Sequence, residues 1–224
     1  MKNLLLLLLV IVVFQTNSFS QEISSISKNA IGVQVGSLGF GVEYSRNISK
    51  KLNLRFGGKF LKISDYIIED IKFDDENFDI VTNLDSQIYD VLIEYLPFNN
   101  SAFKIVTGLG YISNLNLNLD ITYDDEVIIG DINFTKEELG GFITDANWSG
   151  LAPYLGIGFG RAIPKRKFGV ALEIGAYYVN KPKVDFTASG LLTPSGKENA
   201  NLIKDTFQEA KFIPNLNLKL SYKF

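Results

Sequence analysis

Apolar and polar residues alternate with a period of two along most of the chain. The clearest case lies near the end of the sequence, where Leu216, Leu218 and Leu220 are each followed by a polar residue. Successive side chains of a β-strand point to opposite faces, so this pattern predicts a strand with one apolar and one polar face. The same reasoning predicts strands at residues 38–48, 52–63, 81–96, 102–120, 149–161, 168–180 and 212–224.

The polar face of these predicted strands is rich in glycine, namely Gly57, Gly108, Gly110, Gly156, Gly158, Gly160, Gly169 and Gly175. Glycine weakens a strand and a water-exposed face has no need of it, whereas the interior of a narrow closed barrel needs small residues. We therefore expect the polar face to line a barrel and the apolar face, which includes Leu115, Leu117 and Leu119, to contact lipid. Alternation alone is a weak signal, so a secreted soluble barrel that binds an apolar ligand inside is an alternative.

The lengths of the connections indicate an up-and-down barrel. Three connections are short (47–51, 97–101 and 163–167) and three are long and polar (64–80, 121–147 and 187–211). Outer-membrane barrels have short periplasmic turns and long outer loops. We also expect a helix within residues 198–210 and an extra hairpin within 126–135.

The number of strands follows from the positions of the two ends. Both ends are expected on the periplasmic side, which requires an even number of strands. The phase of the alternation changes between Gly36 and Gly39, which favours a tight turn there and a first strand at residues 30–36. The prediction is an all-β, antiparallel up-and-down transmembrane β-barrel of about eight strands.

Aromatic residues gather near the predicted short-turn ends, at Tyr44, Phe56, Tyr95, Phe98, Phe103, Phe159, Phe168, Tyr222 and Phe224. Such a girdle is typical of the interface between membrane and water.

The first residues have the pattern of a secretory signal peptide. Lys2 precedes an apolar run from Leu4 to Phe14, and small residues follow at Ser18 and Ser20. The run is well short of the ~20 residues that a spanning helix needs. We expect a cleaved signal peptide at 1–20, an N-terminal periplasmic segment at 21–29 and the barrel domain at 30–224.

The composition removes most enzymatic interpretations. The 224 residues include no cysteine and no histidine, which excludes disulfides, thiolate chemistry, histidine-ligated zinc and a Ser-His-Asp triad. The segment Gly156–Gly160 reads G-x-G-x-G in mid-strand rather than the G-x-G-x-x-G of a dinucleotide site. We expect no catalytic residues, no cofactor and no metal site. The net charge of −3 is mildly acidic and gives no broad basic surface, so we expect no nucleic-acid partner.

Eight charged residues are expected to point into the lumen by strand parity, namely Glu43, Arg55, Lys59, Asp90, Glu94, Lys104, Glu173 and Lys219. Unpaired charges in a narrow interior are costly, so these four acids and four bases should pair. The favoured interpretation is a structural network that plugs the barrel, and the alternative is a polar path for small solutes. Acidic loops at residues 74–79 and 124–126 lack the spacing of a calcium loop and are interpreted as solvated charge.

Several segments resemble small bacterial outer-membrane β-barrel proteins of the OmpA, OmpX and OmpW type: residues 89–98, 108–111, 152–160, 168–190 and 213–224. The resemblance implies contact with outer-membrane lipid and lipopolysaccharide, and use of the barrel-assembly machinery. Phe224, with Tyr222, resembles the assembly signal of that class.

We hypothesise an integral outer-membrane protein, favoured as a monomer, that is structural or surface-interacting with a mostly plugged lumen. The alternative is a narrow porin or carrier for small polar or amphipathic solutes.

Overall fold

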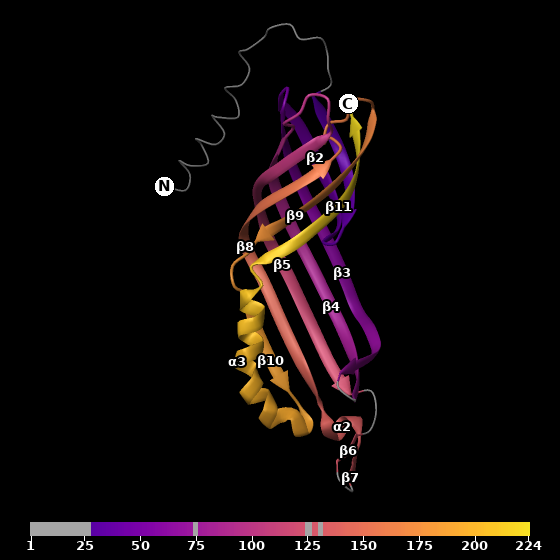
Figure 1. Ribbon diagram of the computed structural model, residues 1–224, viewed down its shortest axis with the longest axis vertical. Helices are drawn as coiled ribbons and strands as arrows, with labels where there is room; N and C mark the ends of the chain where they lie inside the picture. The colour runs from indigo at the N-terminus through magenta and orange to yellow at the C-terminus, as the bar shows by residue number, and fades with distance from the viewer. Residues whose placement is uncertain (1–27, 74–75, 124–126, 130–131) are drawn as a thin grey trace, which may run out of the picture.

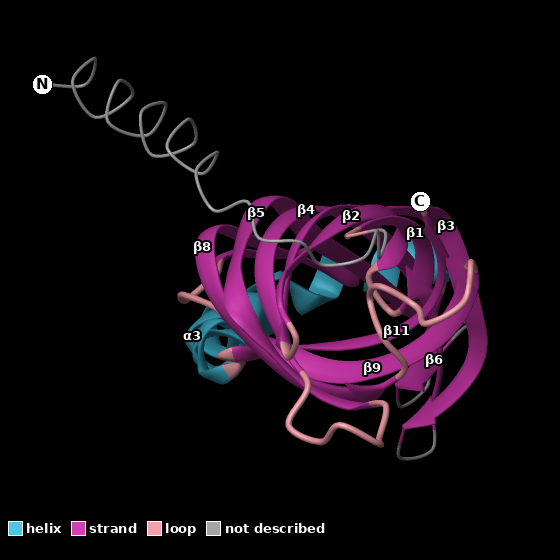
Figure 2. Cartoon of the chain, turned by 90° about the horizontal axis from the view of Figure 1, so that it is seen from above, coloured by secondary structure: helices cyan, strands magenta, loops and turns pink. Residues whose placement is uncertain are grey.

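The structure, a computed structural model, describes residues 28–73, 76–123, 127–129 and 132–224. Eight antiparallel strands pair in a closed ring (Figures 1 and 2), which confirms the predicted barrel. The ring closes because the first strand pairs with the last. Its strands are β1 (Asn29–Gly36), β2 (Gly39–Ser49), β3 (Leu52–Phe73), β4 (Glu76–Tyr95), β5 (Phe103–Tyr123), β8 (Gly141–Phe159), β9 (Phe168–Tyr178) and β11 (Phe212–Lys223). The predicted signal peptide lies outside the described residues.

The predicted first strand and its tight turn are both confirmed. Gly36 and Gly39 are the last paired residues of the β1–β2 hairpin. Gly39 has a φ of 97°, and a Cβ there would stand 2.1 Å from the carbonyl oxygen of Phe60. Only glycine fits such a backbone conformation so close to a neighbouring strand.

The strands have very unequal lengths. The strands β3, β4, β5 and β8 have 22, 20, 21 and 19 residues, whereas β1, β2, β9 and β11 have 8, 11, 11 and 12. The long strands continue past the ring as one curved wall, visible in the lower half of Figure 1. Much of the predicted loops 64–80 and 121–147 is therefore strand. Bulges between Ile63 and Tyr66 and between Ile68 and Ile71 interrupt the alternation and conceal the strand in the sequence.

Several short strands and helices lie at the long-strand end of the barrel. The strands β6 (Val127–Ile129) and β7 (Ile132–Phe134) form the expected extra hairpin, and helix α2 (Lys136–Leu139) follows. Strand β10 (Lys183–Ala188) pairs with the outer part of β8. The short helix η1 (Gly190–Leu192) leads into α3 (Thr193–Glu209), which begins five residues before the range predicted for a helix and ends one residue before the end of that range. Helix α3 lies beside β10 (Figure 1). No described helix has both the length and the hydropathy to cross a membrane.

Apolar side chains cover the outside of the ring and charged side chains lie inside it, which is the reverse of the arrangement in a soluble barrel. Val33, Leu155 and Val170 point outward and are 55%, 65% and 62% exposed, whereas the inward residues are buried. The lipid-facing assignment of Leu115, Leu117 and Leu119 is wrong: Leu115 is buried inside and Leu117 packs against the buried cluster. The cause is a bulge between Ile112 and Leu115, which shifts the register and turns the following leucines to the other face.

Candidate functional site

Eight charged side chains are buried inside the ring, each at most 5% exposed. They are the residues that strand parity assigned to the lumen: Glu43 on β2, Arg55 and Lys59 on β3, Asp90 and Glu94 on β4, Lys104 on β5, Glu173 on β9 and Lys219 on β11. The structure brings them together in two clusters. Four acids and four bases give the set a formal charge of zero.

Arg55 is the centre of the larger cluster. Its Nε and Nη2 donate to Glu43 Oε2 at 2.9 and 2.7 Å, and its Nη1 donates to Glu173 Oε2 at 2.8 Å. Lys219 Nζ lies 2.5 Å from the other oxygen of Glu43. Charge-assisted bonds from a planar guanidinium have a defined geometry, so Arg55 holds two carboxylates from different strands in fixed positions.

The same cluster continues toward the short-turn end through Glu94. Lys104 Nζ lies 3.3 Å from Glu94 Oε2 and 2.8 Å from Glu173 Oε2. The carboxylate of Glu94 also accepts from Asn53 Nδ2 at 2.8 Å and from the backbone N–H of Ala162 at 3.0 Å. These donors share the negative charge of a fully buried group, which would otherwise be costly to desolvate.

The smaller cluster joins Lys59, Asp90 and Tyr177. Lys59 Nζ bonds to Asp90 Oδ2, and it donates to Tyr177 Oη at 2.5 Å. The Tyr177 hydroxyl in turn donates to Asp90 Oδ1 at 2.8 Å. The positive and the negative group thus share one hydroxyl, and the cluster is neutral.

Tyr154 and Tyr177 also belong to this network, and the sequence pattern alone gave neither of them a role. Tyr154 donates to Glu173 Oε1 at 3.0 Å and accepts from Asn215 Nδ2 at 3.1 Å. A Cβ at Gly175 would stand only 2.5 Å from Tyr154 Oη, so this glycine makes the space for the ring. The only sequence signal for this role is a bulky phenol next to glycines on a lumen face.

An apolar layer lies beyond the charges, toward the long-strand end. Ile88 and Ile112 face each other across β4 and β5, and both are buried. Leu38 from the first turn and Trp148 from β8 belong to the same buried cluster. Phe207 of α3 packs on it, with its ring centroid 6.4 Å from that of Trp148. The helix is therefore anchored to the interior of the barrel by an aromatic contact.

Aromatic side chains surround the short-turn end. The rings of Phe168 and Tyr222 have centroids 5.0 Å apart, and those of Phe103 and Phe159 are 5.6 Å apart. Phe224 follows β11 at this end and is exposed. Tyr222 and Phe224, the residues of the expected assembly signal, thus lie at the rim with their side chains accessible.

The fold matches that of solved bacterial proteins. CarO from Acinetobacter baumannii aligns with a TM-score of 0.67 and 21% identity, over 91% of this chain and 100% of that chain. CarO2 from the same organism has a TM-score of 0.67 and 20% identity, over 88% of this chain and 98% of that chain. No protein-family model matches the sequence, and no curated protein matches it. The chain thus has the fold of a small outer-membrane β-barrel protein.

Proposed function

We propose that the protein is an integral protein of the bacterial outer membrane with a closed lumen and a structural or surface-interacting role. The observation that carries this proposal is the reversed polarity: apolar side chains on the outside of the ring, and paired charges inside it. A soluble protein would have to expose this apolar wall to water at a large cost in free energy.

The strand lengths agree with a membrane of ordinary thickness. The 11 residues of β2 span about 36 Å at ~3.3 Å per residue. A tilt of ~45° reduces this to about 25 Å, the height of the apolar band in outer-membrane barrels. At the same tilt the 20 residues of β4 reach about 47 Å. The long-strand wall would therefore project about 20 Å beyond the bilayer, and it is the part that suits a surface interaction.

Export and insertion follow from the same proposal. Residues 1–20 would direct secretion, and the exposed aromatic residues Tyr222 and Phe224 would be recognised by the barrel-assembly machinery. The apolar wall would contact outer-membrane lipid, and the long-strand end would meet lipopolysaccharide. One chain is enough to complete the barrel, because the ring is closed within it, and this favours a monomer.

A narrow channel for small polar or amphipathic solutes is the second candidate. It is favoured by one observation, the column of charged side chains that runs from Glu94 near the short-turn end to Lys59 farther in. The contacts across the ring and the apolar layer at Trp148 argue for closure instead.

The test of the proposal has two stages. In the first, cell membranes are washed with carbonate and the purified protein is run on gels with and without boiling, since closed barrels resist detergent until heated. Release by carbonate together with unshifted migration would contradict membrane insertion. In the second, the protein is reconstituted in planar bilayers. Absence of steady single-channel conductance supports the closed lumen, and reproducible conductance steps support the channel.

A further inference from the structure

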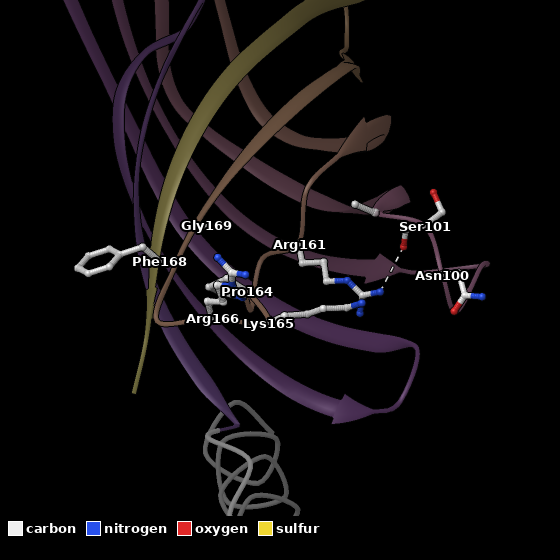
Figure 3. Close-up of a pocket in the computed structure, with 9 residues that line it drawn as sticks. Asn100, Ser101, Arg161, Pro164, Lys165, Arg166, Phe168 and Gly169 are labelled. Carbon is white, nitrogen blue, oxygen red and sulfur yellow. Dashed lines mark hydrogen bonds between the residues drawn. The ribbon is translucent and has the colours of Figure 1, made fainter.

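An open pocket of about 350 Å³ lies at the short-turn end (Figure 3), and none of the eight buried charged residues lines it. The β4–β5 turn and the β8–β9 turn form its walls. Its lining includes Asn100 and Ser101 from the first turn, and Arg161, Lys165, Arg166 and Phe168 from the second. The volume is at the lower end of the ~300–1,000 Å³ that small-molecule sites occupy.

The pocket is strongly basic. Arg161 donates from Nη2 to the backbone carbonyls of Ser101 and Asn99 at 3.2 and 3.4 Å, which fixes the guanidinium against the opposite turn. Lys165 and Arg166 are exposed beside it. Within the described part of the chain, no carboxylate forms an ion pair with any of these three cations. The lining therefore offers positive charge and N–H donors to an anion.

The position of Phe168 indicates which anion fits. This residue lines the pocket, is 65% exposed on the outer wall and contacts the ring of Tyr222. Aromatic residues of barrel girdles lie at the level of the lipid headgroups. The pocket is thus basic on one side and continuous with the apolar wall on the other. A ligand that satisfies both sides carries an anionic group and an apolar tail.

We propose that this pocket binds the phosphate of an anionic phospholipid in the leaflet at the short-turn end. Arg161 and Arg166 would donate to the phosphate oxygens, since guanidinium N–H groups match phosphate geometry. Lys165 would add a point charge, and the acyl chains would lie along the wall next to Phe168. The inference rests on the proposed membrane insertion.

The experiment is native mass spectrometry of the folded protein in detergent micelles, titrated with phosphatidylglycerol or with zwitterionic phosphatidylcholine. The pocket variant combines Arg161→Gln, Lys165→Gln and Arg166→Gln. The control variant combines Lys28→Gln, Arg46→Gln and Lys50→Gln, which removes the same charge from exposed positions elsewhere on the same rim. Heat-modifiable migration checks that both variants fold, so failure of insertion is distinguished from failure of binding.

The wild-type protein should retain phosphatidylglycerol in preference to phosphatidylcholine. The pocket variant should bind phosphatidylglycerol about tenfold more weakly, and the control variant within about twofold of wild type, because only the pocket positions its cations around one site. Equal losses in the two variants would mean a general effect of rim charge and would overturn the proposal. So would equal retention of the two lipids, or displacement of phosphatidylglycerol by millimolar inorganic phosphate. If both variants keep the heat shift and only the pocket variant loses the lipid, the proposal is supported.

Discussion

Arg55 on β3 and Glu173 on β9 stand on opposite sides of the ring, yet Arg55 Nη1 lies 2.8 Å from Glu173 Oε2. Four strand steps separate the two strands in either direction around the ring, so this contact crosses the full width of the barrel. Lys59 and Tyr177, on the same two strands, make a second crossing contact at 2.5 Å. An eight-stranded barrel has an interior just wide enough for side chains to fill, and these contacts indicate how this chain fills it.

The first prediction concerns Arg55. Replacing Arg55 with Met leaves Glu43 and Glu173 buried without their main cation, and such uncompensated charges typically cost about 3–5 kcal/mol. The free energy of unfolding, measured by urea titration in micelles, should fall by that amount. Arg46→Met changes an exposed arginine on the neighbouring strand and should stay within about 0.5 kcal/mol of wild type. Similar values for the two variants would contradict the role given to the network.

The second prediction compares two inward glycines. A Cβ at Gly175 would stand 2.5 Å from Tyr154 Oη and 2.6 Å from the carbonyl oxygen of Leu155, whereas at Gly57 the nearest atom is 3.4 Å away. Gly175→Ala should therefore overpack the lumen and cost about 1–3 kcal/mol, while Gly57→Ala should cost less than about 1 kcal/mol. The measurement is the midpoint of urea unfolding for each variant. A tolerated Gly175→Ala would imply that Tyr154 can leave its position freely.

Strand parity was enough to assign the lumen charges because the face of a residue follows from its immediate neighbours in a strand. Strand parity does not predict which of those charges pair with each other. Contacts such as Arg55 with Glu173 depend on the stagger of the strands around the ring, and a single sequence carries no direct record of it. The sequence pattern therefore gave no role to Tyr154 or Tyr177.

Strand parity predicted the wrong face where a bulge interrupts the regular pairing of two strands. The bulge between Ile112 and Leu115 reverses the faces of the residues beyond it, so leucines assigned to lipid point into the interior. The bulges near Ile63 similarly made the ends of β3 and β4 resemble loops. A bulge that inserts one residue leaves little trace in the sequence. It nevertheless decides which side chains of the following segment point to lipid and which point into the interior.

The third prediction concerns the two faces of β9. Leu172 is 51% exposed on the outer wall, and Ala171 is buried inside. Leu172→Arg should reduce stability in lipid by about 2–4 kcal/mol if it lies near the midplane, because the charge must enter hydrocarbon. Ala171→Ser adds one hydroxyl to a polar interior and should change stability by less than about 1 kcal/mol. Refolding into lipid vesicles with urea titration measures both, and equal effects would contradict the assignment of the faces.

The fourth prediction concerns the aromatic rim. Phe224 is exposed at the short-turn end and contributes no group to the lumen. Phe224→Ser should impair delivery to the outer membrane while leaving folding into micelles largely intact, because the change removes an interfacial anchor but no internal contact. Surface protease accessibility in cells, compared with refolding yield in vitro, separates the two effects. The control is Phe212→Ser, an exposed aromatic residue at the opposite end of the same strand, and equal delivery defects would argue against a specific signal at Phe224.

The fifth prediction uses Trp148, which is the one tryptophan of the chain and is only 8% exposed. Its indole packs against Phe207 of α3 with ring centroids 6.4 Å apart, so its fluorescence reports whether the helix stays on the barrel. Phe207→Ala removes this contact and should shift the emission to longer wavelength and increase quenching by acrylamide, since water reaches the indole. Phe212→Ala removes a phenylalanine of the outer wall and should leave both signals unchanged. If Phe207→Ala also leaves them unchanged, α3 is not held at the mouth of the barrel by this aromatic pair. If it changes them and conductance then appears in planar bilayers, the apolar layer at Trp148 is the barrier that closes the lumen.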